Sequence, residues 1–223
     1  MIGTPRVHHR LTDSTNERAK LLAVEGAPHG TLVTADEQAA GRGRQGRQWT
    51  APAGSAVLMS LVLRELDELL PLTGAVAVCE ALPVDATVKW PNDVWIDRRK
   101  VAGILVEGRP QEGWAVLGVG LNVTTTEFPP ELAETATSLR LSGTDTTRDR
   151  VLDDVLRSLS EWLDAPRDAV LSAWRARDAL KGERVRWSDG EGIADGIDDS
   201  GALLVQTRDG PVTLDAGEVH LLR

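Results

Sequence analysis

The sequence predicts an α+β protein with a larger region at 1–180 and a small all-β region at 181–223. Three observations lead to this prediction. Strand-like segments joined by short polar turns crowd into 86–121, and two segments with apolar residues at helical spacing follow in 151–180. From Lys181-Gly182 onward the chain has only short strand patterns separated by turn signals. These patterns are compatible with the α+β class.

The first part of the chain is expected to form a helix, two strands and a second helix. Ser14-Thr15-Asn16-Glu17 has the Ser-x-x-Glu spacing of a capping box, which opens a helix. A strand is expected at 30–35. Residues 55–63 form a nearly continuous apolar run, which predicts a strand buried on both faces. The second helix should cover much of 67–82, with a break near Pro71.

Four strands are expected in the middle of the chain, at 86–90, 94–96, 100–107 and 114–121. The polar turn Asp97-Arg98-Arg99 suggests a hairpin between the second and third of them. After the less regular segment 122–147, apolar residues at helical spacing predict a helix over 151–163 and another over 167–180.

The last 43 residues carry regularly spaced turn signals, at Ser188-Asp189-Gly190, Asp199-Ser200-Gly201 and Arg208-Asp209-Gly210. This rhythm predicts a small β-barrel or sandwich. A unit of this size is near the lower limit for independent stability, so it should pack against the larger region.

Composition limits the classes of protein that the chain can be. A net charge of -9 argues against a general nucleic-acid binder, which usually has a basic surplus. The longest apolar run, 56–63, is too short to cross a bilayer, and the N-terminus lacks the apolar segment of a secretory signal. The single cysteine, Cys79, excludes an internal disulfide and lies in an apolar stretch, where a small buried residue is expected. A reducing cytoplasm is the compartment that fits.

Residues 41–49 read Gly-Arg-Gly-Arg-Gln-Gly-Arg-Gln-Trp, a cationic loop in an acidic protein. Glycines let backbone N–H groups approach phosphate oxygens, and arginines supply forked donors. Trp49 adds a flat face on which a base can stack. The loop is therefore expected to bind an anion, and the combination suggests a nucleotide.

Lysine is scarce in this chain, and its placement is informative. Of 25 basic residues only four are lysine, and two of these, Lys89 and Lys100, fall within twelve positions. A compact ammonium on a thin stem fits where a guanidinium cannot. The pair therefore indicates a tight site, although chance remains an alternative for so small a count.

Several short motifs follow one another in a fixed order, namely Ser14-Thr15-Asn16, Gln38 before Gly41-Arg42-Gly43-Arg44, Gly46-Arg47-Gln48-Trp49, Lys89-Trp90-Pro91-Asn92-Asp93, Lys100-Val101-Ala102-Gly103-Ile104-Leu105-Val106-Glu107 and Gly118-Val119-Gly120-Leu121-Asn122. With these motifs the chain resembles biotin protein ligases, which activate biotin with ATP and attach it to a lysine of a carrier domain. The resemblance covers most of 14–122, and around 217–219 it extends more loosely to the family's small C-terminal domain.

The resemblance implies a fold and a reaction. The fold is a catalytic domain like that of class II aminoacyl-tRNA synthetases, with a mixed, largely antiparallel sheet flanked by helices, plus a small C-terminal SH3-like β-barrel. The reaction forms biotinyl-5′-AMP from biotin and ATP, with Mg²⁺ carried by the ATP phosphates, and then transfers biotin to a lysine of a biotin carboxyl carrier domain. The chain would thus be a ligase of the type without an N-terminal DNA-binding domain, because the first motif begins at Ser14.

The resemblance also implies roles for individual residues. The residues implied in biotin binding are Ser14, Thr15, Asn16, Gln38, Arg42, Lys100, Gly103 and Ile104. Those implied in ATP or adenylate binding are Arg42, Arg44, Arg47, Trp49, Lys89, Asn92 and Asn122. Arg42 and Lys100 would hold the biotin carboxylate and α-phosphate, and Asp93 would serve as base for the incoming amine.

Each of these residues also has a simpler explanation. Ser14 is equally well explained as a helix N-cap, Asp93 as a turn residue, and Trp49 as an ordinary half-buried tryptophan.

Gln45 stands where most members of the family have a third basic residue, so the loop carries less charge than usual. The histidines have no metal-ligand spacing, and no protein-held metal is expected.

Three other functions remain open. A lipoate-protein ligase shares the fold and the acyl-adenylate chemistry but lacks the arginine–glycine loop. A nucleic-acid binder would use 41–47 as an Arg-Gly segment, against the acidic composition. A pseudoenzyme or interaction module would have lost key residues, and only Gln45 departs from the pattern. No specific DNA and no membrane are expected as partners, and the chain can be a monomer or a homodimer.

Overall fold

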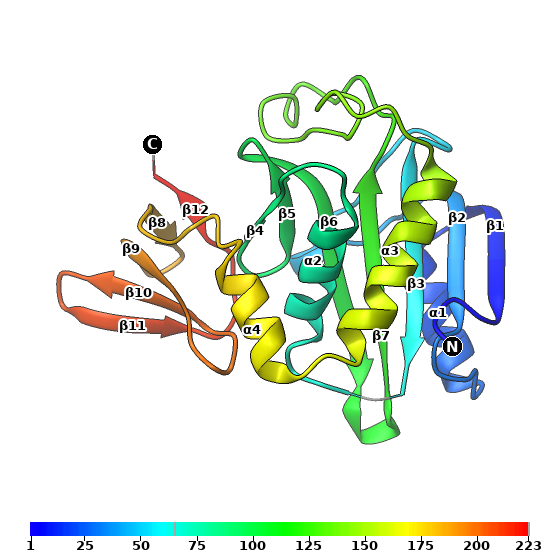
Figure 1. The fold of residues 1–223 in the computed structure, drawn as a ribbon, viewed down its shortest axis with the longest axis horizontal. Coiled ribbons are helices and arrows are strands. Elements are labelled where there is room, and N and C mark those ends of the chain that lie inside the picture. Colours follow the sequence, from blue (N-terminus) through cyan, green and yellow to red (C-terminus); the bar gives the residue numbers. More distant parts are fainter. Residues whose placement is uncertain (65, 223) are drawn as a thin grey trace.

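The computed structural model describes residues 1–64 and 66–222, which form two sheets and four α-helices (Figure 1). The strands of the first sheet are β1 (Arg6–Thr12), β2 (Leu32–Gln38), β3 (Ala56–Leu63), β4 (Thr87–Lys89), β5 (Asp93–Ile96), β6 (Arg99–Arg109) and β7 (Trp114–Asn122). The helices are α1 (Thr15–Val24), α2 (Leu70–Ala81), α3 (Arg148–Leu163) and α4 (Arg167–Arg175). The second sheet contains β8 (Arg184–Trp187), β9 (Gly190–Ile197), β10 (Leu203–Thr207), β11 (Gly210–Leu214) and β12 (His220–Leu221).

The first sheet has the strand order β1-β2-β3-β7-β6-β5-β4. Only the β1–β2 pair is parallel, and the other neighbouring strands run antiparallel. The mixed, largely antiparallel sheet is therefore confirmed. The register places Ser60 opposite Gly118 across β3 and β7, and Leu105 opposite Gly118 across β7 and β6. Glycine thus occupies the middle of the sheet on the face where the candidate site lies.

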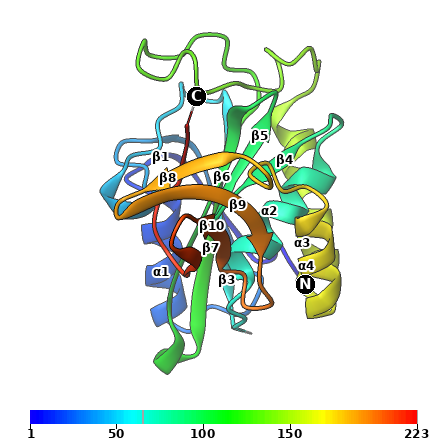
Figure 2. The ribbon, with the colours of Figure 1, turned by 90° about the vertical axis from the view of Figure 1, so that its left-hand side faces the viewer.

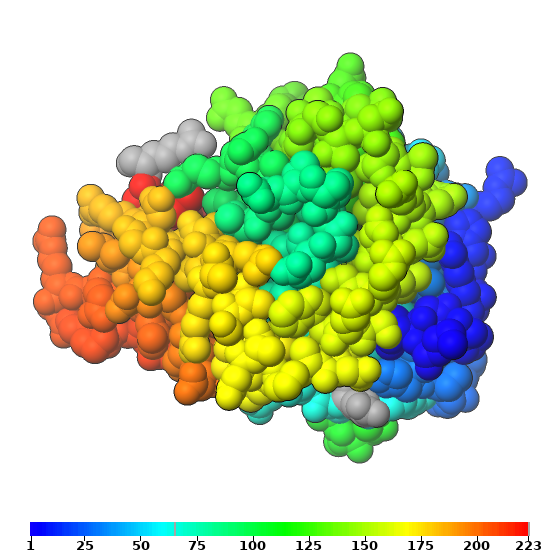
Figure 3. All heavy atoms as spheres, in the orientation of Figure 1, coloured from blue at the N-terminus to red at the C-terminus, as the bar shows by residue number. Residues whose placement is uncertain are grey.

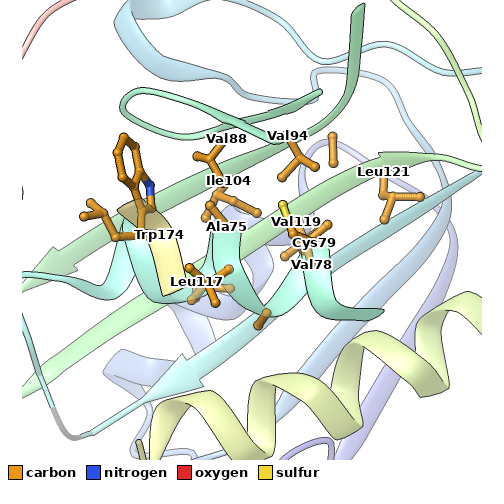
Figure 4. Packing of buried hydrophobic residues seen from close by; sticks show 14 of the residues in the cluster. Ala75, Val78, Cys79, Val88, Val94, Ile104, Leu117, Val119, Leu121 and Trp174 are labelled. Atoms are coloured by element: carbon orange, nitrogen blue, oxygen red, sulfur yellow. The ribbon is translucent and has the colours of Figure 1, made fainter. Parts of the chain in front are cut away.

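Helices cover both faces of this sheet, as the view along its edge shows (Figure 2). Helix α1 packs on one face through Ala19 and Ala23 against Val33, Val62 and Val116. The main core lies on the other face, between the sheet and helices α2, α3 and α4 (Figure 4). All eight residues of β3 are buried, which confirms a strand buried on both faces.

Cys79 of α2 belongs to the main core. Burial raises the pKa of its thiol to about 12, so the thiol is neutral and unreactive, as expected of a buried structural cysteine. Within the described part of the chain, none of the helices combines the length and the apolar character needed to span a membrane.

Three local predictions need correction. The capping box at the start of α1 does not form, because the Ser14 side chain makes no capping hydrogen bond and Glu17 pairs with other side chains. Pro71 lies in the first turn of α2 and begins the helix instead of breaking it, because an N–H is not needed there. Strand β1 was not expected, since Arg6-Val7-His8-His9-Arg10 lacks an alternating apolar pattern.

Helix α4 ends at Arg175, short of the predicted boundary at 180. The chain leaves the helix there to pair with β4: Val88 N–H donates to Arg177 O at 2.8 Å, and Ala179 N–H donates to Val88 O at 3.0 Å. The hairpin between β5 and β6 is confirmed, with Asp97 and Arg98 both at positive φ in its turn.

The C-terminal sheet has the order β11-β10-β9-β8-β12 and is antiparallel throughout. It packs against the larger region, as expected: Trp90 Nε1 donates to Gly201 O at 3.0 Å, and a Cβ at Gly201 would lie 3.1 Å from both Leu69 and Leu72. In the space-filling view this sheet, in orange, abuts helix α4, in yellow (Figure 3). The pocket described next lies between these two regions.

Candidate active site

Two adjoining cavities lie beneath the loop 41–49. The first, of about 120 Å³, is lined by every residue predicted to bind biotin or the adenylate except Asn122. The second, of about 750 Å³, includes Asn122. The residues that line both are Arg47, Gln48, Trp49, Lys89, Asp93, Lys100 and Glu218. The structure therefore brings together all of the predicted site residues, with Lys100 and Asp93 where the two cavities meet.

Glycines of β6 and β7 form the floor of the first cavity. A Cβ at Gly118 would lie 2.1 Å from Asn16 Oδ1, and a Cβ at Gly120 would lie 2.5 Å from Trp49 Cε2. Real Cβ atoms do not approach other atoms so closely, so any side chain at these positions would displace Asn16 or Trp49. Gly118 and Gly120 thus leave room for groups that line the pocket.

The start of α1 forms a polar end of the first cavity. Gln38 Oε1 of β2 accepts hydrogen bonds from Thr15 N–H at 2.7 Å and from Thr15 Oγ1 at 3.0 Å. Gln38 thus satisfies a first-turn N–H that has no partner within the helix. The Ser14 side chain, which lines the cavity, makes no capping bond to the helix.

Ser60 is a residue of the candidate site that sequence reasoning missed. It is completely buried in β3, and its Oγ lies 2.6 Å from Asn16 Oδ1 and 2.8 Å from Thr15 Oγ1. The available signal was a single hydroxyl in the middle of an apolar strand. A buried polar group is retained only where it is hydrogen-bonded, and here its partners are pocket residues.

The loop 41–49 folds back on itself and is fastened at both sides. Arg44 donates from Nη1 to Asn92 Oδ1 at 3.1 Å and from Nη2 to Gly217 O at 3.3 Å, and burial lowers the pKa of its guanidinium. Arg47 forms an ion pair with Glu218. The loop is thus tied both to the catalytic sheet and to the C-terminal region, whose contributing residues the sequence did not identify.

Arg42 has different partners from those predicted. Its guanidinium pairs with Glu17 of α1 and lies 3.6 Å from Glu107 of β6. These carboxylates raise the pKa of Arg42, and the largest cause is the hydrogen bond that Arg42 donates to Glu17. A contact of Arg42 with a biotin carboxylate stays a prediction, and it would require exchanging these protein carboxylates for the ligand.

The junction of the two cavities contains an ion pair. Lys100 Nζ lies 2.6 Å from Asp93 Oδ1 and 5.6 Å from the centre of the Trp49 ring. Asn92 is fixed beside them, because its Nδ2 donates to Ile104 O at 2.5 Å and its O accepts from Ile104 N–H at 2.9 Å. The cation and the carboxylate predicted to act in the chemistry are therefore in direct contact.

The second cavity has its own polar groups. Lys89 lies 5.6 Å from the Trp95 ring, and burial, aided by the nearby charges of Lys100 and Arg47, lowers the pKa of its ammonium. Asn122 donates from Nδ2 to Thr137 O at 3.0 Å, whereas its buried Oδ1 finds no hydrogen-bond partner among residues 1–64 and 66–222. The cavity therefore contains a cation and an acceptor that a ligand could use.

The donor set suits Mg²⁺ bound mainly through a ligand. In residues 1–64 and 66–222, no three His, Cys, Asp or Glu side chains cluster as a metal site. Asp93 is a carboxylate at the cavity junction, and Mg²⁺ commonly uses one or two carboxylates together with substrate phosphates and water. The residues present thus fit an ion that arrives with a phosphate ligand.

Comparison with known proteins adds two family matches. Residues 8–123 match the Biotin/lipoate A/B protein ligase family, and residues 182–222 match the Biotin protein ligase C terminal domain. The chain is 34% identical to the bifunctional ligase/repressor BirA of Bacillus subtilis, over 99% of this chain and 75% of that protein. It is 36% identical to the biotin–[acetyl-CoA-carboxylase] ligase of Mycobacterium tuberculosis, over 95% of this chain and 87% of that protein.

Solved structures agree with these matches. The biotin protein ligase from Aquifex aeolicus in complex with biotin and ATP has a TM-score of 0.85 and 31% identity, over 99% of each chain. At lower identity, 18%, the fold also matches the biotin acetyl coenzyme A carboxylase synthetase of Helicobacter pylori, with a TM-score of 0.71 over 97% of this chain and 99% of that one.

Proposed function

Since this chain belongs to the Biotin/lipoate A/B protein ligase family, we propose that it is an ATP-dependent biotin protein ligase. It forms biotinyl-5′-AMP from biotin and ATP and transfers biotin to a lysine of a biotin carboxyl carrier domain. The observation that carries this proposal is the junction of the two cavities at Lys100 and Asp93, with a polar end for biotin on one side and cationic groups for a nucleotide on the other.

The first step joins two anions. A carboxylate oxygen of biotin attacks the α-phosphorus of ATP, a P–O bond forms, and pyrophosphate leaves. Lys100, Arg44 and Arg47 would offset the charge that accumulates, and removing one such prepositioned group typically costs about 3 to 4 kcal/mol. Mg²⁺ on the ATP phosphates would add positive charge and orient the leaving group. Arg44 is already held in place by Asn92 and Gly217.

The second step needs an uncharged amine. The acceptor lysine attacks the acyl carbonyl of biotinyl-5′-AMP, an amide bond forms, and AMP leaves with the electrons of the broken C–O bond. Asp93 would take the proton that the amine loses. Its contact with Lys100 supports this role, because movement of Lys100 toward the phosphate would free the Asp93 carboxylate.

The remaining residues divide between the two cavities. We assign the polar head of biotin to Ser14, Thr15, Asn16 and Gln38, and its chain to the neighbourhood of Gly103 and Ile104. We assign the nucleotide to Trp49, Lys89, Asn92 and Asn122, with Arg42 kept as a candidate for both ligands.

In this proposal the chain has a catalytic domain at 1–180 and a C-terminal domain at 181–223, and the acceptor is a carboxylase carrier domain. The net charge of -9 supports a protein that binds no specific DNA, and the use of a single, buried cysteine supports a cytoplasmic location.

The test is incubation with biotin, ATP, Mg²⁺ and an apo carrier domain, followed by mass spectrometry. One lysine of the carrier should gain one biotinyl group. A parallel reaction with lipoate separates the alternative within the family, since preferential lipoylation would reject the proposal. Omitting ATP should abolish labelling, because the carboxylate must be activated before an amine can attack it.

A further inference from the structure

Glu107, near the end of β6, contacts both helix α1 and the loop 41–49 at the polar end of the pocket. Its Oε2 accepts from Asn16 Nδ2 at 2.9 Å, and its Oε1 lies 3.2 Å from Lys20 Nζ and 3.6 Å from Arg42 Nη1. Glu17 pairs with the same two cations. Two carboxylates and two cations therefore balance each other beside the pocket, and among these four side chains it is Glu107 that accepts a hydrogen bond from the Asn16 side chain.

This contact fixes the orientation of the Asn16 amide. A carboxylate can only accept hydrogen bonds, so Asn16 must present its NH₂ group to Glu107 and its Oδ1 to Ser60. An amide oxygen also only accepts, and the single hydroxyl proton of Ser60 is therefore directed to Asn16 Oδ1, 2.6 Å away. Glu107 thus determines the direction of the hydrogen bond that Ser60 makes.

The effect extends to Thr15 and Gln38. With its proton on the Asn16 side, Ser60 Oγ offers only lone pairs to Thr15 Oγ1, 2.8 Å away. The Thr15 proton then goes to Ser60 or to Gln38 Oε1, which leaves a lone pair of Thr15 Oγ1 for a ligand. Because Gln38 uses its Oε1 for Thr15, its NH₂ group remains a donor. This end of the pocket therefore offers an acceptor and a donor side by side.

We propose that Glu107 is a positioning residue that sets the donor–acceptor pattern of the pocket's polar end through Asn16 and Ser60. The pattern fits a cyclic urea, whose N–H groups donate and whose carbonyl accepts. This inference rests on the proposed function, because the urea in question is the ureido ring of biotin. Arg42, at the start of the loop 41–49, is held mainly by Glu17, and Glu107 lies farther away, at 3.6 Å.

The test compares Glu107→Gln with the wild type by calorimetry. A glutamine can present either its oxygen or its NH₂ group, so the Asn16 amide is no longer held in one orientation. We expect the Kd for biotin to rise about tenfold or more, with ATP binding within about twofold of wild type. Ser60→Ala removes the hydroxyl that donates to Asn16 Oδ1 and changes the size of the side chain very little. It should also weaken biotin binding. Glu112→Gln is the matched control, since Glu112 pairs with Arg109 on the β6–β7 hairpin, away from the cavities.

A second readout separates positioning from simple stabilisation. In 2-iminobiotin a nitrogen donor replaces the ureido oxygen, so the wild type should bind biotin more tightly than this analogue. In Glu107→Gln the ratio of the two Kd values, for 2-iminobiotin and for biotin, should move closer to one. The midpoint of thermal unfolding should stay close to that of Glu112→Gln. An unchanged preference, with or without loss of stability, would overturn the inference. Failure of the wild type to bind biotin would instead reject the proposed function.

Discussion

Lys100 Nζ lies 2.6 Å from Asp93 Oδ1, so the cation proposed for the first chemical step neutralises the base proposed for the second. One contact thus links the two half-reactions. While the ammonium stays on Asp93, it occupies the carboxylate oxygen that would receive the proton. In the proposed mechanism, phosphate oxygens attract Lys100, and the Asp93 carboxylate is then free to accept the proton of the incoming amine.

Asp93→Asn should separate the two half-reactions. Pyrophosphate release in the first turnover should change only severalfold, whereas transfer to the carrier should slow by about 10² to 10⁴, the usual range for loss of a general base. Rapid-quench measurement of biotinyl-5′-AMP and of labelled carrier provides both rates. Asp189→Asn, in an exposed turn of the C-terminal sheet, is the control. Equal slowing of both steps would mean that Asp93 serves only to place Lys100.

Arg44→Gly should loosen the loop over the intermediate. It removes the hydrogen bonds to Asn92 and Gly217, and hydrogen bonds from charged groups are each worth about 1.5 to 3 kcal/mol. We expect biotinyl-5′-AMP to leave the enzyme roughly ten to a hundred times faster, measured by filtration or by non-enzymatic labelling of bystander amines. Arg208→Gly changes an exposed turn in the same way and should retain the adenylate. Retention by Arg44→Gly as well would exclude this role.

The two glycines of β7 should affect different ligands. A methyl group at Gly120 would meet Trp49, and one at Gly118 would meet Asn16. We therefore expect Gly120→Ala to weaken nucleotide binding and Gly118→Ala to weaken biotin binding, each by about tenfold. Calorimetry with each ligand alone provides the four affinities, and each variant is the control for the other. A uniform loss of both ligands would indicate general disruption of the sheet.

Lys89 should make ATP binding sensitive to alkaline pH. Burial lowers the pKa of its ammonium, so the proton is lost at a lower pH than in an ordinary lysine. Phosphates bind the protonated form, and this contribution is complete below the lowered pKa and is lost as the pH rises through it. The KM for ATP should therefore increase on the alkaline side in the wild type. Lys89→Arg keeps its charge and should flatten the profile; an identical rise in both proteins would point to another group.

The sequence predicted the sheet well where packing determines the pattern. Strand β3 is apolar except for Ser60 because helices cover both its faces, and its buried run was recognised. Strand β1 was missed because it is an edge strand whose side chains are mostly exposed, so no core face imposes an apolar alternation. The end of α4 was missed because a backbone pairing with Val88, far away in sequence, ends the helix there.

For the site, the motifs identified the lining residues but not their supports. Glu107 ends one of the motifs and Glu218 lies in the loosely similar segment 217–219, but neither was assigned a role, and Ser60 belongs to none of the motifs. Only the folded chain brings Ser60 and Glu107 to Asn16, and Glu218 to Arg47. No sequence pattern predicts that a single serine within a strand, or a glutamate near a strand end, will support a binding site. Arg42 illustrates the same limit, since its charge suggested an anionic ligand while its partners are Glu17 and Glu107.

The backbone pairing between β4 and residues 177–179 connects the sheet to the segment that leads into the C-terminal region, and this connection affects how the protein unfolds. Deleting everything after 180 would remove the acceptor of the Trp90 N–H and uncover apolar surface beside Leu69 and Leu72. Strand β4, which ends at Lys89 beside Trp90, would then lose its contact with the C-terminal region. Melting should therefore proceed as a single cooperative event, and neither piece should persist as an independently folded fragment after proteolytic cleavage.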